Sequence, residues 1–178
     1  MITYVAFLRG INSGLNPTLK MDVLKTAFEE LGFQNVKTVI ASGNVIFDAE
    51  ATDESDLEQT IEKALPQRIG FESATIVYKL KDLQRLAKLD AFEGIKVTPS
   101  TRLFVTFVKK PPKSNQKISG NGFEIIRKSG RALFSVLDLA GTTPDLMKIL
   151  DKEFGKTNTT RSWKTIEKIL QKAEASHS

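Results

Sequence analysis

Two short polar segments near the start of the chain combine residue types that can bind an oxyanion. They are Arg9-Gly10-Ile11-Asn12 and Ser42-Gly43-Asn44. Together they offer a guanidinium group, two amides, a hydroxyl and glycine-exposed backbone N–H groups, a set that suits a phosphate or a carboxylate. The alternative is structural, because tight turns require glycine and asparagine, and an arginine at a strand end often ties loops together. We predict Arg9, Gly10, Asn12, Ser42, Gly43 and Asn44 as ligand-binding residues.

A third polar segment runs from Asn158 to Thr165, near the other end of the chain. Its hydroxyls and its arginine stand just before or inside the first turn of a predicted helix, where free N–H groups and the helix dipole attract anions. The alternative is a capped helix in which Trp163 belongs to the core. We take Thr160, Arg161 and Trp163 as further ligand-binding candidates. The sequence does not decide whether the three polar segments form one site.

The residues that are missing limit the chemistry. The chain has no cysteine, which excludes disulfides, thiolate catalysis and cysteine-containing zinc sites. Its one histidine is His177, in a tail that we expect to be disordered, so neither imidazole catalysis nor histidine metal ligation is expected. We therefore predict no metal site and no cofactor. An enzyme would have to use carboxylates, hydroxyls, lysine, arginine or tyrosine.

Charge is divided unevenly along the chain. Residues 1–100 hold 11 basic and 14 acidic side chains, whereas residues 101–178 hold 15 basic and 7 acidic ones. This asymmetry favours an anionic partner for the second half, although a solvated basic face that serves solubility is the alternative. The candidate nucleic-acid patch comprises Lys109, Lys110, Lys113, Arg127, Lys128 and Arg131.

The first half of the chain predicts the elements that position the first two polar segments. The expected order is a strand over residues 2–8, a helix that starts at Asn16-Pro17 and ends at Gly32, strands over 36–40 and 45–47, a helix opened by a Ser55 and Glu58 capping box, and a strand over 74–78. This is the βαββαβ order of ferredoxin-like folds. In that fold the first and third strands are antiparallel neighbours. Asn44 should therefore lie beside Leu8 and Arg9.

The second half predicts a related but less regular set of elements. A strand over 102–108 is followed by a hairpin over 123–137, a helix that starts at Thr143-Pro144 and a last helix from Trp163. We interpret the chain as α+β, with a ferredoxin-like subdomain over residues 1–98, a degenerate basic α+β subdomain over 99–174 and a disordered tail over 175–178.

Several motifs occur in a characteristic order along the chain. They are Leu8-Arg9-Gly10-Ile11-Asn12, Leu31-Gly32-Phe33, Ser42-Gly43-Asn44-Val45-Ile46-Phe47 and Thr159-Thr160-Arg161-Ser162-Trp163-Lys164-Thr165. With them the sequence resembles a bacterial family known only as domain of unknown function number 1697. The last motif departs from the family, since Ser162 and Lys164 replace two asparagines. The resemblance implies an α+β fold with ferredoxin-like halves and brings no assigned activity.

These observations favour a non-enzymatic binding module whose partner is an anionic small molecule or a nucleic acid. An enzyme acting on a phosphorylated or carboxylated small molecule and a protein-interaction domain are the alternatives. RNA stacking on Tyr4, Phe7 or Phe47 of the first sheet is a further, weaker interpretation. The chain has no apolar run long enough to cross a membrane and no signal peptide, so we expect a cytoplasmic protein. The sequence indicates no oligomeric state.

Overall fold

The chain forms two compact units. The computed structural model describes residues 1–113, 118–120, 122–140 and 145–175. Unit 1 comprises residues 1–85 and 167–178, and unit 2 comprises residues 86–166. The subdomain boundary predicted near residue 98 stays a prediction. His177 lies outside the described residues, as do residues 176–178 of the predicted tail.

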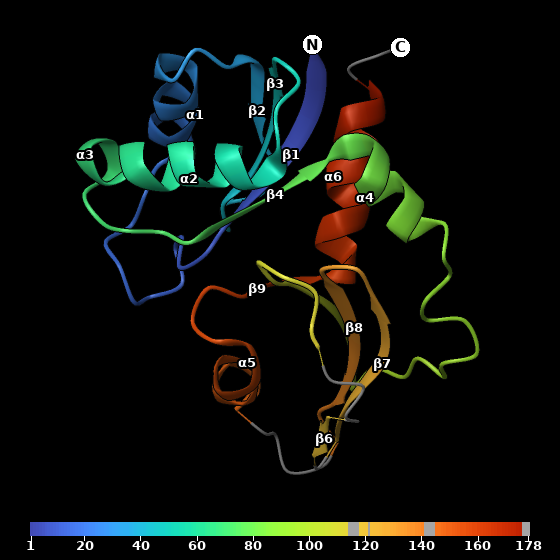
Figure 1. Cartoon of the computed structure of the whole chain (residues 1–178). Helices are drawn as coiled ribbons and strands as arrows, with labels where there is room; N and C mark the ends of the chain where they lie inside the picture. The colour runs from blue at the N-terminus through green and yellow to red at the C-terminus, as the bar shows by residue number, and fades with distance from the viewer. Residues whose placement is uncertain (114–117, 121, 141–144, 176–178) are drawn as a thin grey trace. The chain divides into compact units, whose positions relative to one another are not determined.

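Unit 1 contains one four-stranded antiparallel sheet (Figure 1). Its elements are β1 Ile2–Leu8, α1 Met21–Glu30, β2 Gln34–Thr38, β3 Asn44–Ala49, α2 Glu54–Ala64, α3 Pro66–Ile69, β4 Thr75–Lys79 and α4 Leu80–Ala87, the last of which continues into unit 2. The strand order is β2-β3-β1-β4, which is the ferredoxin-like arrangement. Strands β1 and β3 are antiparallel neighbours with Phe7 opposite Asn44, which confirms the predicted pairing.

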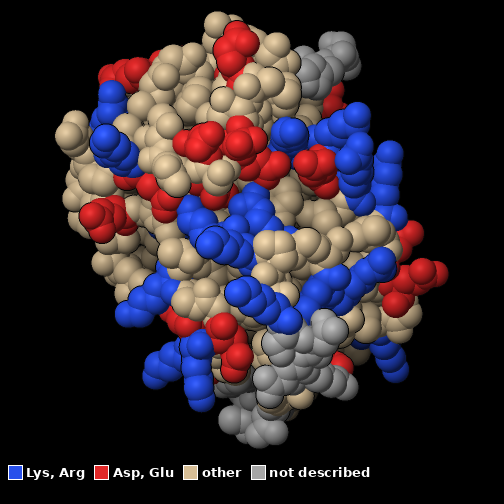
Figure 2. All heavy atoms as spheres, viewed as in Figure 1, with Lys and Arg blue, Asp and Glu red and all other residues tan. Residues whose placement is uncertain are grey.

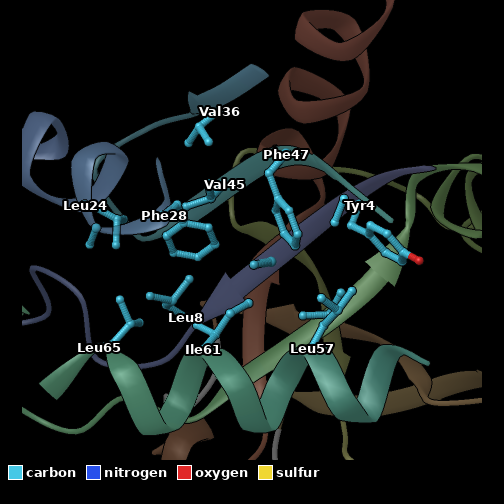
Figure 3. Packing of buried hydrophobic residues seen from close by; sticks show 14 of the residues in the cluster. Tyr4, Leu8, Leu24, Phe28, Val36, Val45, Phe47, Leu57, Ile61 and Leu65 are labelled. Atoms are coloured by element: carbon cyan, nitrogen blue, oxygen red, sulfur yellow. The ribbon is translucent and has the colours of Figure 1, made fainter. Parts of the chain in front are cut away.

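The core of unit 1 lies between one face of this sheet and its helices (Figure 3). Alternate residues of β1 face α1 and α2, as the two-residue period of a strand requires. The Phe47 ring lies 5.7 Å from Tyr4, 5.5 Å from Phe28 and 4.5 Å from Phe33, measured between centroids. Offset and edge contacts of this kind add about 0.5–1.5 kcal/mol each beyond the burial itself.

This burial removes one functional interpretation. Tyr4 and Phe47 are fully buried in the core of unit 1, and Phe7 is fully buried on the other face of the sheet, together with Val5 and Ile76. A base can stack only on an aromatic ring that solvent reaches. None of the three rings is therefore available for RNA stacking, and the alternative that they belong to the core holds.

Two helix starts differ from the prediction. Helix α1 begins at Met21, because the chain before it is held as a loop in which the Asn16 amide donates to the Gly10 carbonyl at 3.2 Å. The Ser55 and Glu58 capping box does not form, and no side chain caps α2. Glu58 is instead buried and accepts a hydrogen bond from the backbone N–H of Val77 in β4, at 2.8 Å.

Unit 2 contains a second antiparallel sheet with the order β6-β7-β8-β5-β9. Its elements are β5 Thr101–Phe107, β6 Ser119–Gly120, β7 Phe123–Ser129, β8 Ala132–Asp138, α5 Leu146–Phe154, β9 Thr159–Ser162 and α6 Trp163–Ala175, which runs on into unit 1. Helix α5 packs on one face of the sheet over Phe123, Leu133 and Leu137. The predicted helix start at Thr143-Pro144 lies outside the described residues, and the described helix is capped by Asp145, which accepts from the Lys148 N–H.

The two sheets have the same strand connectivity, and their strands can be aligned residue by residue. Reading β5, β7, β8 and β9 as first to fourth strand gives the same neighbours as in unit 1. The matching positions are Phe7 and Phe107, Asn44 and Ala132, Ile76 and Thr159, and, at the start of the helix that follows the fourth strand, Leu80 and Trp163. No helix corresponding to α1 is present among the described residues between β5 and β7. Unit 2 is thus the degenerate α+β half that the sequence predicts.

Candidate functional site

The first two polar segments meet at the end of the unit 1 sheet where β1 ends and β3 begins. The Leu8 N–H donates to the Gly43 carbonyl at 2.9 Å, and the Asn12 amide donates to the Ala41 carbonyl at 2.8 Å. The loop after β1 and the turn between β2 and β3 therefore lie side by side, as the topology predicts. We call this region the sheet end of unit 1.

The side-chain amide of Asn12 joins these loops through hydrogen bonds from its nitrogen and to its oxygen. Besides its bond to Ala41, its nitrogen donates to the Leu19 carbonyl at 3.0 Å and its oxygen accepts from the Leu19 N–H at 2.8 Å. Its backbone φ is 54°, in the left-handed region that asparagine tolerates better than most residues. These contacts give Asn12 a structural role, because its amide is satisfied by main-chain groups.

Asn44 performs a similar task in the turn between β2 and β3. It is fully buried, and its nitrogen donates to the Val39 carbonyl at 2.9 Å and to the Ser42 hydroxyl at 3.0 Å. Burial without such partners would cost about 1–3 kcal/mol. Asn44 thus holds the turn closed.

Gly43 is required by close packing at the sheet end. Its φ is +88°, and a Cβ at this position would lie 2.6 Å from Cγ1 of Ile11 and 3.2 Å from Cβ of Leu8. Gly10 is less constrained, since a Cβ there would meet only the Asn16 amide, at 2.9 Å, although its φ of +77° also favours glycine. Both glycines therefore serve the turn geometry.

Arg9 lies at the same end with its backbone fixed on both sides. Its N–H donates to the Ala74 carbonyl at 2.9 Å, and its carbonyl accepts from the Ser73 hydroxyl at 2.7 Å. The residue is half-buried. Its place beside the two loops agrees with the predicted geometry, and its ligand-binding role stays a prediction.

An open pocket of about 710 Å³ adjoins this sheet end. It is lined by Asn12, Gly14, Asn16, Thr18, Leu19, Lys20, Met21, Asp22 and Ala41. Asn12 is the one predicted ligand residue among them. The pocket opens at the start of α1, where Lys20 occupies the N-cap position and makes no side-chain cap. Sequence reasoning missed Thr18 and Lys20 because it placed residues 17–20 inside the helix.

The third polar segment contains strand β9, in unit 2, and the first residues of α6, which begins at Trp163 as predicted. Thr159–Ser162 pairs antiparallel with β5, a pairing that the sequence analysis does not predict. The Thr160 hydroxyl lies 2.8 Å from that of Thr106 across the pair. Ser162 alone acts at the helix start, where its Oγ accepts from the Thr165 N–H at 3.3 Å.

Arg161 is buried, and Trp163 packs against aromatic residues of unit 2. One of the Nη atoms of Arg161 donates to the Thr160 carbonyl at 3.0 Å, and burial lowers the pKa of its guanidinium to about 10. At neutral pH it is still charged. The Trp163 ring makes edge contacts with Phe92 at 5.4 Å and Phe134 at 5.9 Å, which supports its structural role. The convergence of this segment with the unit 1 sheet end stays a prediction.

Most of the predicted nucleic-acid patch gathers at one end of the unit 2 sheet. The Val108 N–H donates to the Arg131 carbonyl at 2.9 Å, which brings Lys109 and Lys110, after β5, next to the turn between β7 and β8. Arg127 instead donates to the Leu89 carbonyl at 3.1 Å. Lys113 is exposed beyond two prolines. On the face shown in Figure 2, basic and acidic side chains are interspersed rather than separated into one basic field.

Comparison with known proteins identifies the family. A family model described as "Protein of unknown function (DUF1697)" matches residues 1–124, which is more than half of the chain. The chain belongs to this family. The DUF1697 match includes the whole sheet end of unit 1 and ends before β9. No curated protein gives a significant match.

A solved structure supports the fold of this DUF1697 chain. It is the conserved bacterial protein SP0830 from Streptococcus pneumoniae, with a TM-score of 0.64 and 19% identity over 96% of this chain and 97% of that chain. At this identity the likeness shows the fold alone. Within the described ranges, no group of three or more His, Cys, Asp or Glu residues could hold a metal ion, and no helix is long and apolar enough to cross a membrane.

Proposed function

We propose that this protein is a non-enzymatic binding module for a small anionic ligand that bears a phosphate or a carboxylate group. The observation that carries the proposal is the pocket beside the sheet end of unit 1. Its volume of about 710 Å³ suits a small molecule, since ligand sites usually measure roughly 300–1,000 Å³. The proposal moves the predicted site by a few residues, from the asparagines that fasten the loops to the cavity that those loops border.

The lining supplies donors for an anion. Asn16 offers an amide, Thr18 a hydroxyl and Lys20 an ammonium group, at the start of a helix whose first N–H groups have no side-chain cap. Asp22 is the one acidic residue in the lining, and Lys20 and Asp22 are its ionisable side chains. The lining thus lacks the histidine, cysteine or paired carboxylates on which most acid–base and nucleophilic catalysis relies, which favours binding over turnover.

The test is a binding titration in low salt with inorganic phosphate and acetate, followed by NMR. We expect chemical-shift changes in residues 14–22, and we expect Lys20→Ala to weaken binding about tenfold, which corresponds to about 1.4 kcal/mol. The matched control is Lys25→Ala, because Lys25 is an exposed lysine of the same helix that does not line the pocket. Equal losses in both variants, or shifts spread over the surface, would mean that the anions respond only to net charge.

Nucleic acid is a second candidate ligand, favoured by one contact. The bond between Val108 and Arg131 joins two basic turns at one end of the unit 2 sheet. Phosphate contacts give binding that falls steeply with salt. Neither the enzyme nor the protein-interaction alternative is favoured by a comparable observation.

The nucleic-acid candidate predicts a salt-dependent effect of its lysines. The double substitution Lys109→Ala and Lys110→Ala should weaken binding of a fluorescent single-stranded 20-mer and reduce the salt slope by about 1–2. Fluorescence anisotropy measured between 50 and 200 mM salt would give both quantities. The control is Lys148→Ala with Lys152→Ala, which removes two exposed charges from α5 in the same unit. An unchanged slope in the Lys109 and Lys110 variant would remove this candidate.

A further inference from the structure

The pocket beside α1 is bordered by apolar as well as polar groups. Leu19, Met21 and Ala41 are among the residues that line it. In the sequence, Lys20 is therefore flanked by the apolar lining residues Leu19 and Met21. An inorganic anion would use the lysine and would leave this apolar part of the wall in contact with water.

Two large apolar side chains are exposed next to residues that line the pocket, and we call these two residues its rim. Leu15, between the lining residues Gly14 and Asn16, is 86% exposed, and Ile40, which precedes Ala41, is 42% exposed. Single exposed apolar residues are ordinary, but exposed apolar residues beside a concave site favour a ligand that covers them.

Ile40 adds a second anomaly at this rim. Its φ is 59°, in the left-handed region that a β-branched residue rarely adopts. Such a conformation is unfavourable and persists where the surrounding structure enforces it, often at ligand sites. Here the buried Asn44 amide holds the preceding carbonyl, that of Val39, at 2.9 Å. An exposed isoleucine in a strained conformation therefore precedes the lining residue Ala41.

We infer that the ligand is an amphipathic acid, a small molecule with one carboxylate or phosphate head and an apolar body. This inference rests on the proposed function and names its ligand class. The head binds at Lys20, and the apolar body covers Met21 and the exposed rim residues Leu15 and Ile40. Transfer of methylene groups from water to this rim supplies affinity that the exposed lysine alone does not, since each buried CH₂ contributes about 0.8 kcal/mol.

The experiment is an NMR titration with the carboxylate series acetate, butyrate, hexanoate and octanoate at constant ionic strength. We expect affinity to rise about twofold to fourfold per methylene, the upper value being full burial of each CH₂. Leu15→Ser and Ile40→Thr should flatten this rise while leaving acetate binding unchanged. Lys20→Ala should weaken every member by the same factor and keep the rise. Val97→Ser, which changes a 63% exposed valine of unit 2, is the control and should change neither.

The outcomes separate the two proposals. If no carboxylate and no phosphate binds, the proposed function fails. If acetate and octanoate bind equally, the anion site stands and the amphipathic ligand is wrong. If the rise with chain length survives in both rim variants, or is lost equally in Val97→Ser, the apolar body binds elsewhere and the inference is overturned.

Discussion

Replacing Gly43 with alanine is expected to lower the free energy of unfolding by about 4 kcal/mol, from left-handed backbone strain and overpacking together. The added methyl group would lie 2.6 Å from Cγ1 of Ile11 and 3.2 Å from Cβ of Leu8, at a φ of +88°. Neither neighbour can move easily, because both are buried, and Leu8 is bonded through its N–H to the Gly43 carbonyl. The two loops that border the pocket would be pushed apart.

Gly14→Ala is the matched control for this substitution. Its φ of +90° is nearly the same, but a Cβ there would have no atom within 4 Å, so only the backbone strain of roughly 1 kcal/mol remains. Urea unfolding followed by circular dichroism measures both variants. The one tryptophan, Trp163, reports unit 2 by fluorescence and helps to locate the change. Similar losses for the two glycines would show that close packing against Ile11 is unimportant.

Gly43 also shows which features of the site can be predicted from the sequence. A glycine in Ser42-Gly43-Asn44 predicts a tight turn, and the alternation of apolar residues in the flanking segments predicts the strands. With the βαββαβ order these local signals suffice to place Asn44 beside β1. They do not reveal that the glycine faces Ile11, because that contact depends on the packing of a loop more than 30 residues earlier in the chain.

The roles of the asparagines were predictable in type but not in detail. Asn12 and Asn44 are found at the sheet end, as expected, but their amides bond to the carbonyls of Leu19, Ala41 and Val39. A sequence gives the donors of a polar segment, whereas the acceptors come from whichever backbone groups the fold leaves unpaired. A side chain whose chemistry suits a ligand can therefore already be bonded to the backbone of its own or a neighbouring loop.

Strand β9 shows a different limit. Thr159–Ser162 is four residues long and polar, and it is followed at once by α6, so its hydroxyls resemble a helix cap. Its partner β5 lies some fifty residues earlier, and no local pattern indicates this pairing. Thr159 and Arg161 are buried, whereas Thr160 and Ser162 are half-buried. This alternation is typical of a strand, but it can be recognised only from the burial of each residue in the folded structure.

Replacing Glu58 with alanine is expected to lower the free energy of unfolding by about 2–3 kcal/mol, because a buried N–H loses its acceptor. Strand β4 is an edge of the unit 1 sheet, and α2 lies against it. The outward N–H of Val77 donates to the Glu58 carboxylate at 2.8 Å, and that of Thr75 donates to Glu62 at 3.3 Å. Glu58 and Glu62 of α2 thus accept hydrogen bonds from main-chain N–H groups that would otherwise be able to pair with a further strand.

Glu58→Gln separates the hydrogen bond from the charge. The glutamine carbonyl can still accept from Val77, so we expect a loss below about 1 kcal/mol if acceptance by the side chain is what matters. Glu62→Ala should also cost less than Glu58→Ala, because the Glu62 contact is longer and the residue is only half-buried. Urea unfolding gives the three values, and size-exclusion chromatography of Glu58→Ala tests whether the uncovered edge pairs with a second molecule. Equal losses for alanine and glutamine at position 58 would contradict this account, since they would make the buried charge, rather than the capped edge, the source of stability.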